Sequence, residues 1–251
     1  MNKKINTPSG DRGKNIIITG ASRGLGKAIA EKFAANNYNL YLSSKNDIAL
    51  YKTMEELQTK YPSITIKAKA FDISKSEEAK TLGQWILSLG ISIDILINNA
   101  GNFLPGNVHD EKEGTLEEMM KVNLFSAYHL TRTLLPQMMK QETSNSSKAH
   151  IFNMCSIASL KAYSNGGSYS ISKFALAGFS KNLREEMKPF GIKVTAVYPG
   201  AVFTDSWNGS GIDKKRIMEA NDIADMIYTS SQLSPQATVE DIIIRPQLGD
   251  L

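Results

Sequence analysis

One stretch near the amino end of the chain constrains the fold more than any other. Residues 15–19, NIIIT, form a short apolar run rich in β-branched side chains, typical of a strand buried on both faces of a parallel sheet. A glycine-rich turn, residues 20–26, follows directly, and Leu25, Ile29 and Phe33 then recur at helical spacing. A turn of this kind lets backbone approach a phosphate group, whose charge the helix N-terminus stabilises. The order strand, glycine turn, helix therefore predicts a nucleotide-binding α/β unit.

The rest of the chain repeats this alternation. Helical patterns separate further apolar runs, at residues 39–43, 64–71, 93–97, 149–155, 193–198 and 239–244. Alternating strands and helices predict a doubly wound α/β sheet, here with seven mostly parallel strands and helices on both faces. We expect one long helix from Thr115 to about Gln141, which Pro136 kinks or ends. Ser74 with Glu77, and Thr115 with Glu118, match the S/T-x-x-E pattern of a capping box.

Composition excludes several classes of protein. With 251 residues, 41% apolar and 22% charged, the chain resembles an ordinary globular protein, and its net charge of +4 is too small for a nucleic-acid-binding stripe. No apolar run is long enough to span a membrane, and the three histidines are too scattered to indicate a metal site. The single cysteine, Cys155, suits a reducing compartment, so we expect a cytoplasmic protein. We expect residues 1–13 to form a flexible polar arm and residues 14–251 a single domain.

Tyr169 and Lys173 are the first candidates for chemistry. Four residues apart on a helix, their side chains project from one face. A free tyrosine has a pKa of about 10, and a nearby ammonium group would lower it toward the range where acid–base catalysis is efficient. The same spacing also occurs where a lysine stem merely covers an aromatic ring, so the pair needs its context.

That context comes from three motifs in order: TGASRGLG at residues 19–26, NNAG at residues 98–101 and YSISK at residues 169–173. Together they resemble the short-chain dehydrogenase/reductase family, and the resemblance extends over roughly residues 15–244. It implies a Rossmann-type fold that carries out reversible hydride transfer between a nicotinamide cofactor and a carbonyl/alcohol pair.

The resemblance also implies catalytic roles. Tyr169 would exchange the proton, and Ser156, thirteen residues earlier, would hydrogen-bond the substrate oxygen. Lys173 would lower the pKa of Tyr169 and bind the nicotinamide ribose, while Asn123 would hold a water that links Lys173 to solvent. Taken from the residues alone, Ser156 could be a turn former and Asn123 a tolerated surface residue.

Cofactor preference depends on the end of the second strand. NAD-specific sites carry an acidic residue there to bind the ribose 2′-hydroxyl, but this chain has no acid until Asp47. Arg23 and Lys45 occupy the two places where NADP-preferring members of the family carry basic residues. Either could be a solvated surface cation, but two cations without the acid favour NADP(H).

The family pattern assigns further positions to the cofactor. Asp72 and Ile73 would lie beside the adenine, and the PG-x-V-x-T turn at residues 199–204 would reach the nicotinamide. The predicted cofactor-binding residues are Gly20, Ser22, Arg23, Gly24, Leu25, Gly26, Ser44, Lys45, Asp72, Ile73, Asn99, Ala100, Gly101, Tyr169, Lys173, Pro199, Gly200, Val202 and Thr204. Residues 205–213, rich in glycine, serine and asparagine, would form a mobile substrate lid.

The substrate is less defined. Many relatives reduce 3-oxoacyl groups on acyl carrier protein, but the end of this chain, residues 244–251, lacks the Asp-Gly-Gly common in them. That departure is closer to sepiapterin-reductase-like and other small-carbonyl reductases. A different class, a non-catalytic NADPH-sensing regulator, is disfavoured by the complete set Asn123, Ser156, Tyr169 and Lys173. We expect a homodimer or homotetramer, a small or carrier-bound carbonyl substrate, and neither nucleic-acid nor membrane partners.

Overall fold

The computed structural model describes residues 13–142, 148–204 and 211–250. Most of the expected arm at residues 1–13 and most of the expected lid at 205–213 therefore lie outside the described residues. Within them the chain forms a sheet of seven strands in the order β3-β2-β1-β4-β5-β6-β7. The strands are β1 (Asn15–Thr19), β2 (Asn39–Ser44), β3 (Ile66–Ala70), β4 (Ile95–Asn98), β5 (Ala149–Met154), β6 (Ile192–Pro199) and β7 (Asp241–Ile244). The expected doubly wound sheet is confirmed, and every neighbouring pair is parallel.

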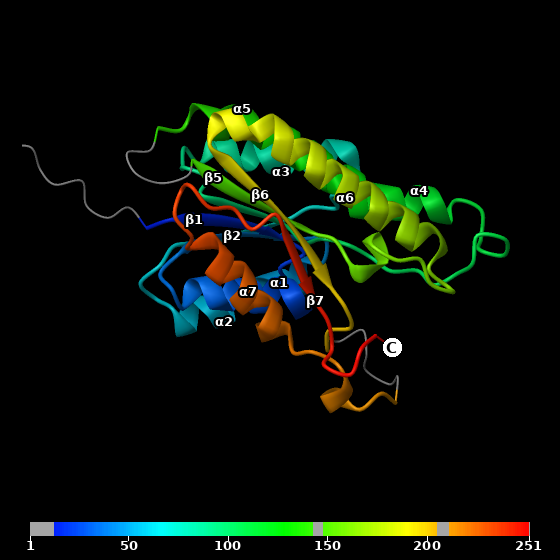
Figure 1. Ribbon diagram of the computed structural model, residues 1–251. Helices are drawn as coiled ribbons and strands as arrows, with labels where there is room; N and C mark the ends of the chain where they lie inside the picture. Colours follow the sequence, from blue (N-terminus) through cyan, green and yellow to red (C-terminus); the bar gives the residue numbers. More distant parts are fainter. Residues whose placement is uncertain (1–12, 143–147, 205–210, 251) are drawn as a thin grey trace, which may run out of the picture.

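Helices cover both faces of the sheet. The longer ones are α1 (Gly24–Ala34), α2 (Asp47–Lys60), α3 (Ser76–Ser88), α4 (Thr115–Met120), α5 (Ser126–Lys140), α6 (Gly167–Met187) and α7 (Ala220–Ser231). Short 3₁₀ helices are η2 (Ile157–Ser159), η3 (Lys188–Phe190) and η5 (Lys214–Arg216). In Figure 1, α1, α2 and α7 lie below the sheet, whereas α3, α5 and α6 lie above it.

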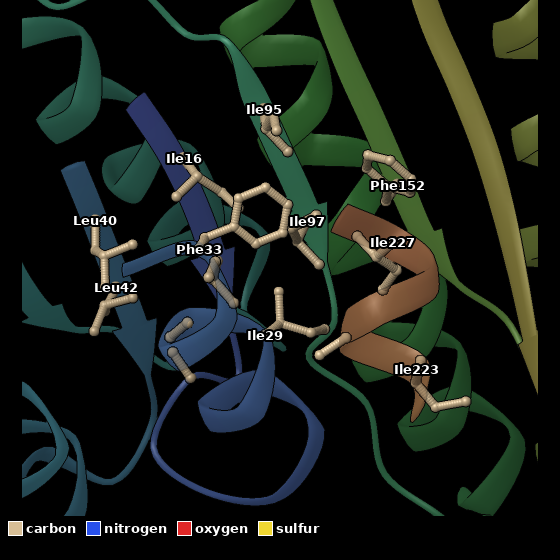
Figure 2. Close-up of a cluster of buried hydrophobic side chains, with 14 of the residues drawn as sticks. Ile16, Ile29, Phe33, Leu40, Leu42, Ile95, Ile97, Phe152, Ile223 and Ile227 are labelled. Carbon is tan, nitrogen blue, oxygen red and sulfur yellow. The ribbon is translucent and has the colours of Figure 1, made fainter. Parts of the chain in front are cut away.

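The position of β1 inside the sheet explains why its sequence is apolar without alternation. Side chains on a strand point to opposite faces in turn, so a strand between two helical layers needs apolar residues at every position. Ile16 and Ile18 join the core between the sheet and helices α1 and α7, while Ile17 joins the core on the other face. Figure 2 shows the first of these cores, where Ile29 from α1 and Ile227 from α7 meet the side chains of the sheet.

The long helix expected from Thr115 to Gln141 is interrupted. A π-helical turn, η1 (Lys121–Phe125), separates α4 from α5. Such turns insert one extra residue into a helix and occur frequently at functional sites. Pro136 lies inside α5, which continues to Lys140, so the proline does not end the helix.

Neither expected capping box forms. Lys75 is the N-cap of α3, and the hydroxyl of Ser74 donates instead to the carboxylate of Asp72 at 2.6 Å. Gly114 is the N-cap of α4, with a φ of 86°, and the Thr115 hydroxyl donates to the carbonyl oxygen of Lys112. The N-cap of α3 thus lies one residue after Ser74, and that of α4 one residue before Thr115.

Candidate active site

The predicted site residues gather where the strands end. Thr19, Ser44, Asn98, Met154 and Pro199 are the last residues of five parallel strands, so their carboxyl ends share one edge of the sheet. The strand order reverses between β1 and β4. In doubly wound sheets, ligands bind in the crevice at such a reversal.

The glycine turn after β1 has the geometry of an anion-binding cradle. Gly20 and Gly24 have φ values of 65° and 54°, which favour glycine. A Cβ at Gly26 would lie 2.2 Å from the carbonyl oxygen of Gly20, so only glycine fits there. The N-cap residue of α1, Arg23, makes no side-chain cap, and the first turn holds no acidic residue. The residues present therefore fit a phosphate group at the N-terminus of α1.

The NNAG turn is fastened to this cradle. The Thr19 hydroxyl accepts the N–H groups of Asn99 and Ala100, each at 3.0 Å. The Asn99 side chain in turn donates to the carbonyl oxygens of Thr19 and Gly20. Asn98 points into the core and donates to Asn153 on β5 at 2.8 Å. The turn after β4 is thus held against the end of β1.

At the ends of β2 and β3 the structure contains an ion pair that was not predicted from the sequence. The ammonium group of Lys45 lies 3.0 Å from the carboxylate of Asp72. Burial alone would raise the pKa of Asp72, but hydrogen bonds from Ser74 and Lys45 hold it below its usual range. The Lys45 side chain is 76% exposed and Arg23 is also exposed, so both cations remain accessible to an anionic ligand. Ser44 donates to the hydroxyl of Ser22, which joins β2 to the glycine turn.

The turn after β6 also lies at this edge of the sheet. A Cβ at Gly24 would lie 3.2 Å from a side-chain carbon of Thr204, so this turn contacts the start of α1. Gly200 donates its N–H to Ile244 on β7 at 2.8 Å, and Val202 forms an isolated bridge with Met218. Of the predicted residues in this turn, Pro199 and Val202 are buried, while Gly200 and Thr204 are half-buried.

The four predicted catalytic residues come together beside the NNAG turn. The Ser156 hydroxyl accepts the N–H of Ala158 and lies close enough to the phenol of Tyr169 to lower its pKa. The Lys173 amine is 5.8 Å from the centre of the Tyr169 ring. A Cβ at Gly101 would lie 3.0 Å from Oδ1 of Asn123 and 3.4 Å from Nζ of Lys173. One small volume therefore contains a hydroxyl, a phenol, an amine and an amide.

The electrostatics of this group differ from the sequence-based expectation. Burial raises the pKa of Tyr169, and the nearby Ser156 hydroxyl only partly opposes that effect. Burial also lowers the pKa of Lys173 to about 8. The Lys173 amine donates to the carbonyl oxygen of Met154. No lowering of the Tyr169 pKa by Lys173 is seen in this structure. Tyr169 is a protonated phenol at neutral pH.

Comparison with known proteins gives the context for this geometry. Residues 14–215 match the family described as short chain dehydrogenase. The chain belongs to the short-chain dehydrogenase family. The predicted oxidoreductase class and Rossmann-type fold are thereby confirmed.

Individual relatives of this family cover nearly the whole chain. A sepiapterin reductase of Chlorobaculum tepidum is 32% identical over 94% of this chain and 97% of its own. A diacetyl reductase of Staphylococcus epidermidis, described as (S)-acetoin forming, is 31% identical over 84% of this chain and 80% of its own. The solved structure of an alcohol dehydrogenase from Thermococcus sibiricus, complexed with 5-hydroxy-NADP, superposes with a TM-score of 0.84 at 25% identity, covering 94% of this chain and 97% of its own.

Two further residues of this site, Ser172 and Asn102, were not predicted from the sequence. Ser172 accepts the side-chain N–H of Asn123 at 2.9 Å and donates to the carbonyl oxygen of Tyr169 at 2.7 Å. Asn102 exchanges two hydrogen bonds with Asn123, through its own backbone N–H and carbonyl oxygen. Asn123 lies in the π-helical turn and is buried, so it is not a surface residue. Ser172 belongs to the YSISK motif, where its place next to Lys173 was the available signal.

The structure also bears on membrane-spanning helices and metal sites in this short-chain dehydrogenase. Among the described residues, no helix is both long enough and apolar enough to cross a bilayer. In the same part of the chain, no three His, Cys, Asp or Glu side chains gather closely enough to hold a metal ion.

Proposed function

We propose that this protein is an NADP(H)-dependent reductase that transfers hydride between the nicotinamide and a carbonyl/secondary alcohol pair. The observation that carries the proposal is the proximity of the Ser156 hydroxyl to the phenol of Tyr169, beside the buried amine of Lys173. A phenol placed next to a second hydroxyl can protonate an oxygen that the second hydroxyl also contacts. That is the arrangement that reduction of a carbonyl requires.

The chain's own residues supply the proton and the orientation. When bound, the cofactor supplies the hydride. Tyr169 gives its phenolic proton to the developing alkoxide, and Ser156 holds that oxygen. Because the pKa of Tyr169 is raised, the phenol is protonated at neutral pH and ready for the reducing direction. Lys173 holds the nicotinamide ribose, and Asn123, fixed by Asn102 and Ser172, completes the proton path to solvent.

The cofactor would be held along the whole edge of the sheet. The glycine turn and the N-terminus of α1 take the pyrophosphate. Arg23 and Lys45 take the 2′-phosphate, and Asp72 with Ile73 lies beside the adenine. Residues 99–101 and the turn at 199–204 contact the nicotinamide end. The Thermococcus sibiricus structure complexed with 5-hydroxy-NADP and the exposed cations support NADP(H) over NAD(H).

We propose a small conjugated carbonyl, within the range from a diketone to a pterin, as the substrate. The names of the Staphylococcus epidermidis and Chlorobaculum tepidum relatives support this class. The surroundings of the phenol support it too, because the Phe103 ring contacts Tyr169 edge-on at 4.9 Å and is 47% exposed. Tyr163, also 47% exposed, interacts electrostatically with Tyr169. Exposed aromatic rings beside a catalytic phenol favour a flat or apolar substrate.

A substrate panel tests this function. The purified protein is mixed with NADPH and with diacetyl, sepiapterin, an aromatic diketone or a 3-oxoacyl thioester, and loss of NADPH absorbance is followed. We expect turnover with at least one of the first three. Turnover with the thioester alone would favour the acyl-carrier substrate that the sequence also suggested. Binding of NADPH without turnover of any carbonyl would favour a non-catalytic regulator.

We also propose that residues 14–251 form a single domain and that the protein assembles as a homodimer or homotetramer. Large apolar side chains are exposed on the outer surface of η1, α5 and α6, among them Phe125, Tyr128 and Phe174. Light scattering coupled to size-exclusion chromatography measures the assembly directly. A cytoplasmic location fits the single cysteine, Cys155, which is buried, and cell fractionation tests it.

A further inference from the structure

The helix that carries Tyr169 is capped from a distant part of the chain. The N-cap residue of α6, Gly166, has no side chain to accept the free N–H groups of the first turn. Glu111, in the loop between β4 and α4, accepts the backbone N–H of Ser168 at 3.2 Å and also the Ser168 hydroxyl. Ser168 is 1% exposed and directly precedes Tyr169.

We propose that Glu111 is a positioning residue for the reaction. It fixes the first turn of α6, and with it the phenol of Tyr169, to the loop that follows β4. The proposal rests on the proposed function, since it assigns Glu111 to the reductase reaction. No local sequence pattern marks Glu111 for this role, because it lies 57 residues from Ser168.

The Glu111 side chain lies between two glycines. A Cβ at Gly106 would lie 2.9 Å from Cβ of Glu111, and one at Gly167 would lie 2.9 Å from its Oε2. Gly106 and Gly166 form a parallel bridge, and Gly106 donates its N–H to Asn165 at 3.2 Å. The loop and the start of α6 are therefore joined by backbone contacts, and Glu111 supplies a charged acceptor at their centre.

The same loop reaches the catalytic residues from two sides. Asn102, near its beginning, holds Asn123 by two hydrogen bonds. Phe103, the next residue, places its ring edge-on against Tyr169 at 4.9 Å. Loss of the Glu111 carboxylate would leave the buried N–H of Ser168 unpaired and would free the loop and the first turn of α6 to separate. The Tyr169 phenol would then lose its alignment with Ser156.

The test compares Glu111→Ala with Glu111→Gln in the assay that the parental protein supports. Misplacement of a reacting group by about 1 Å can reduce the rate by about a hundredfold. We expect Glu111→Ala to lower kcat by about 10- to 100-fold, with the Kd of NADPH within about twofold of the parental value. Glu111→Gln, whose amide oxygen can still accept the N–H of Ser168, should recover most of that kcat. Glu113→Ala, an exposed glutamate of the same loop, is the matched control.

A double variant checks that Glu111 acts through Ser168. If it does, the losses of kcat in Glu111→Ala and Ser168→Ala are less than additive in the combined protein. Should Glu111→Ala fail to fold, Glu111→Asp, shorter by one methylene, carries the same comparison.

Two results would overturn the inference. If folded Glu111→Ala keeps the parental kcat, the carboxylate does not position Tyr169. The same conclusion follows if the kcat of Glu111→Gln is as low as that of Glu111→Ala. In both, the parental protein still turns over, so the proposed function stands. If the parental protein itself reduces no carbonyl, the proposed function fails and this inference fails with it.

Discussion

Nζ of Lys173 donates a 2.8 Å hydrogen bond to the carbonyl oxygen of Met154, two residues before Ser156. The bond connects the middle of the catalytic helix to the end of β5, so the amine and the Ser156 hydroxyl are fixed by the same strand. Lys173 is 5% exposed, and this burial lowers its pKa to about 8. The amine is therefore poised to gain or lose its proton close to neutral pH.

Replacing this amine should strongly reduce catalytic efficiency. We expect Lys173→Met to lower kcat/KM by at least about a hundredfold, because the variant has neither the cation beside Tyr169 nor the donor for the ribose. Steady-state kinetics with NADPH measure the loss. Lys181→Met, an exposed lysine of the same helix, should keep the parental rate. Equal activity of the two variants would remove Lys173 from the mechanism.

Removal of one oxygen atom tests the proton donor. Tyr169→Phe should lose about 10²- to 10⁴-fold in kcat, the usual contribution of a positioned proton donor, while NADPH binding stays largely intact. Tyr163→Phe is the matched control, because this neighbouring tyrosine is 47% exposed and has no proposed role in proton transfer. Fluorescence titration gives the NADPH affinity and single-turnover kinetics the chemical step. Turnover of Tyr169→Phe near the parental rate would refute the assignment.

Two glycine-to-alanine changes should have opposite effects. In Gly26→Ala the new methyl group would lie 2.2 Å from the carbonyl oxygen of Gly20, so the cofactor turn must deform. We expect weaker NADPH binding and a lower Tm. Gly178, inside α6, has no atom within 4 Å of a new Cβ, so Gly178→Ala should stabilise the fold by about 0.5–1 kcal/mol. Thermal unfolding with and without NADPH separates the two outcomes.

The cofactor preference should depend on two cations. We expect Arg23→Ala combined with Lys45→Ala to raise the KM for NADPH by at least about a hundredfold and to leave the KM for NADH nearly unchanged. Each charge-assisted hydrogen bond to the 2′-phosphate contributes about 1.5–3 kcal/mol, and NADH lacks that group. Lys75→Ala, an exposed lysine on the loop after β3, serves as the control. A proportional loss with both cofactors would show that the cations act elsewhere.

Stability should fall in acid because of a histidine in the core. His150 is stacked on Phe152 with ring centres 3.9 Å apart, and burial lowers its pKa from 6.5 to about 3. Between these values the unfolded chain binds a proton that the folded chain does not. The free energy of unfolding therefore decreases as pH falls from 6.5 toward 3, by up to about 4–5 kcal/mol from this residue.

Urea unfolding at several pH values measures that dependence. His150→Gln should flatten the curve in the window below pH 6.5, because the amide does not titrate there. His109→Gln, whose side chain is 80% exposed in the parental protein, should leave the curve unchanged. An acid slope that is the same in His150→Gln and the parental protein would contradict the prediction.

The sequence predicted what is encoded locally. Alternating apolar runs predicted the sheet, and the three motifs predicted which residues meet at its edge. Features that depend on partners distant in the chain were not predictable. The ion pair of Lys45 with Asp72 and the cap that Glu111 gives to Ser168 join segments far apart in sequence. The raised pKa of Tyr169 depends on burial, which a motif does not report.

The parallel arrangement of the sheet has a consequence for how the chain reaches its native state. Parallel neighbours cannot be joined by a tight hairpin, so each pair requires closure of a long connection. The central pair joins Ile16 of β1 to Ile95 of β4, and no local contact can replace it. Such distant pairings slow folding. During synthesis, β1 leaves the ribosome well before β4, and its run of isoleucines stays exposed to aggregation until the partner strand arrives.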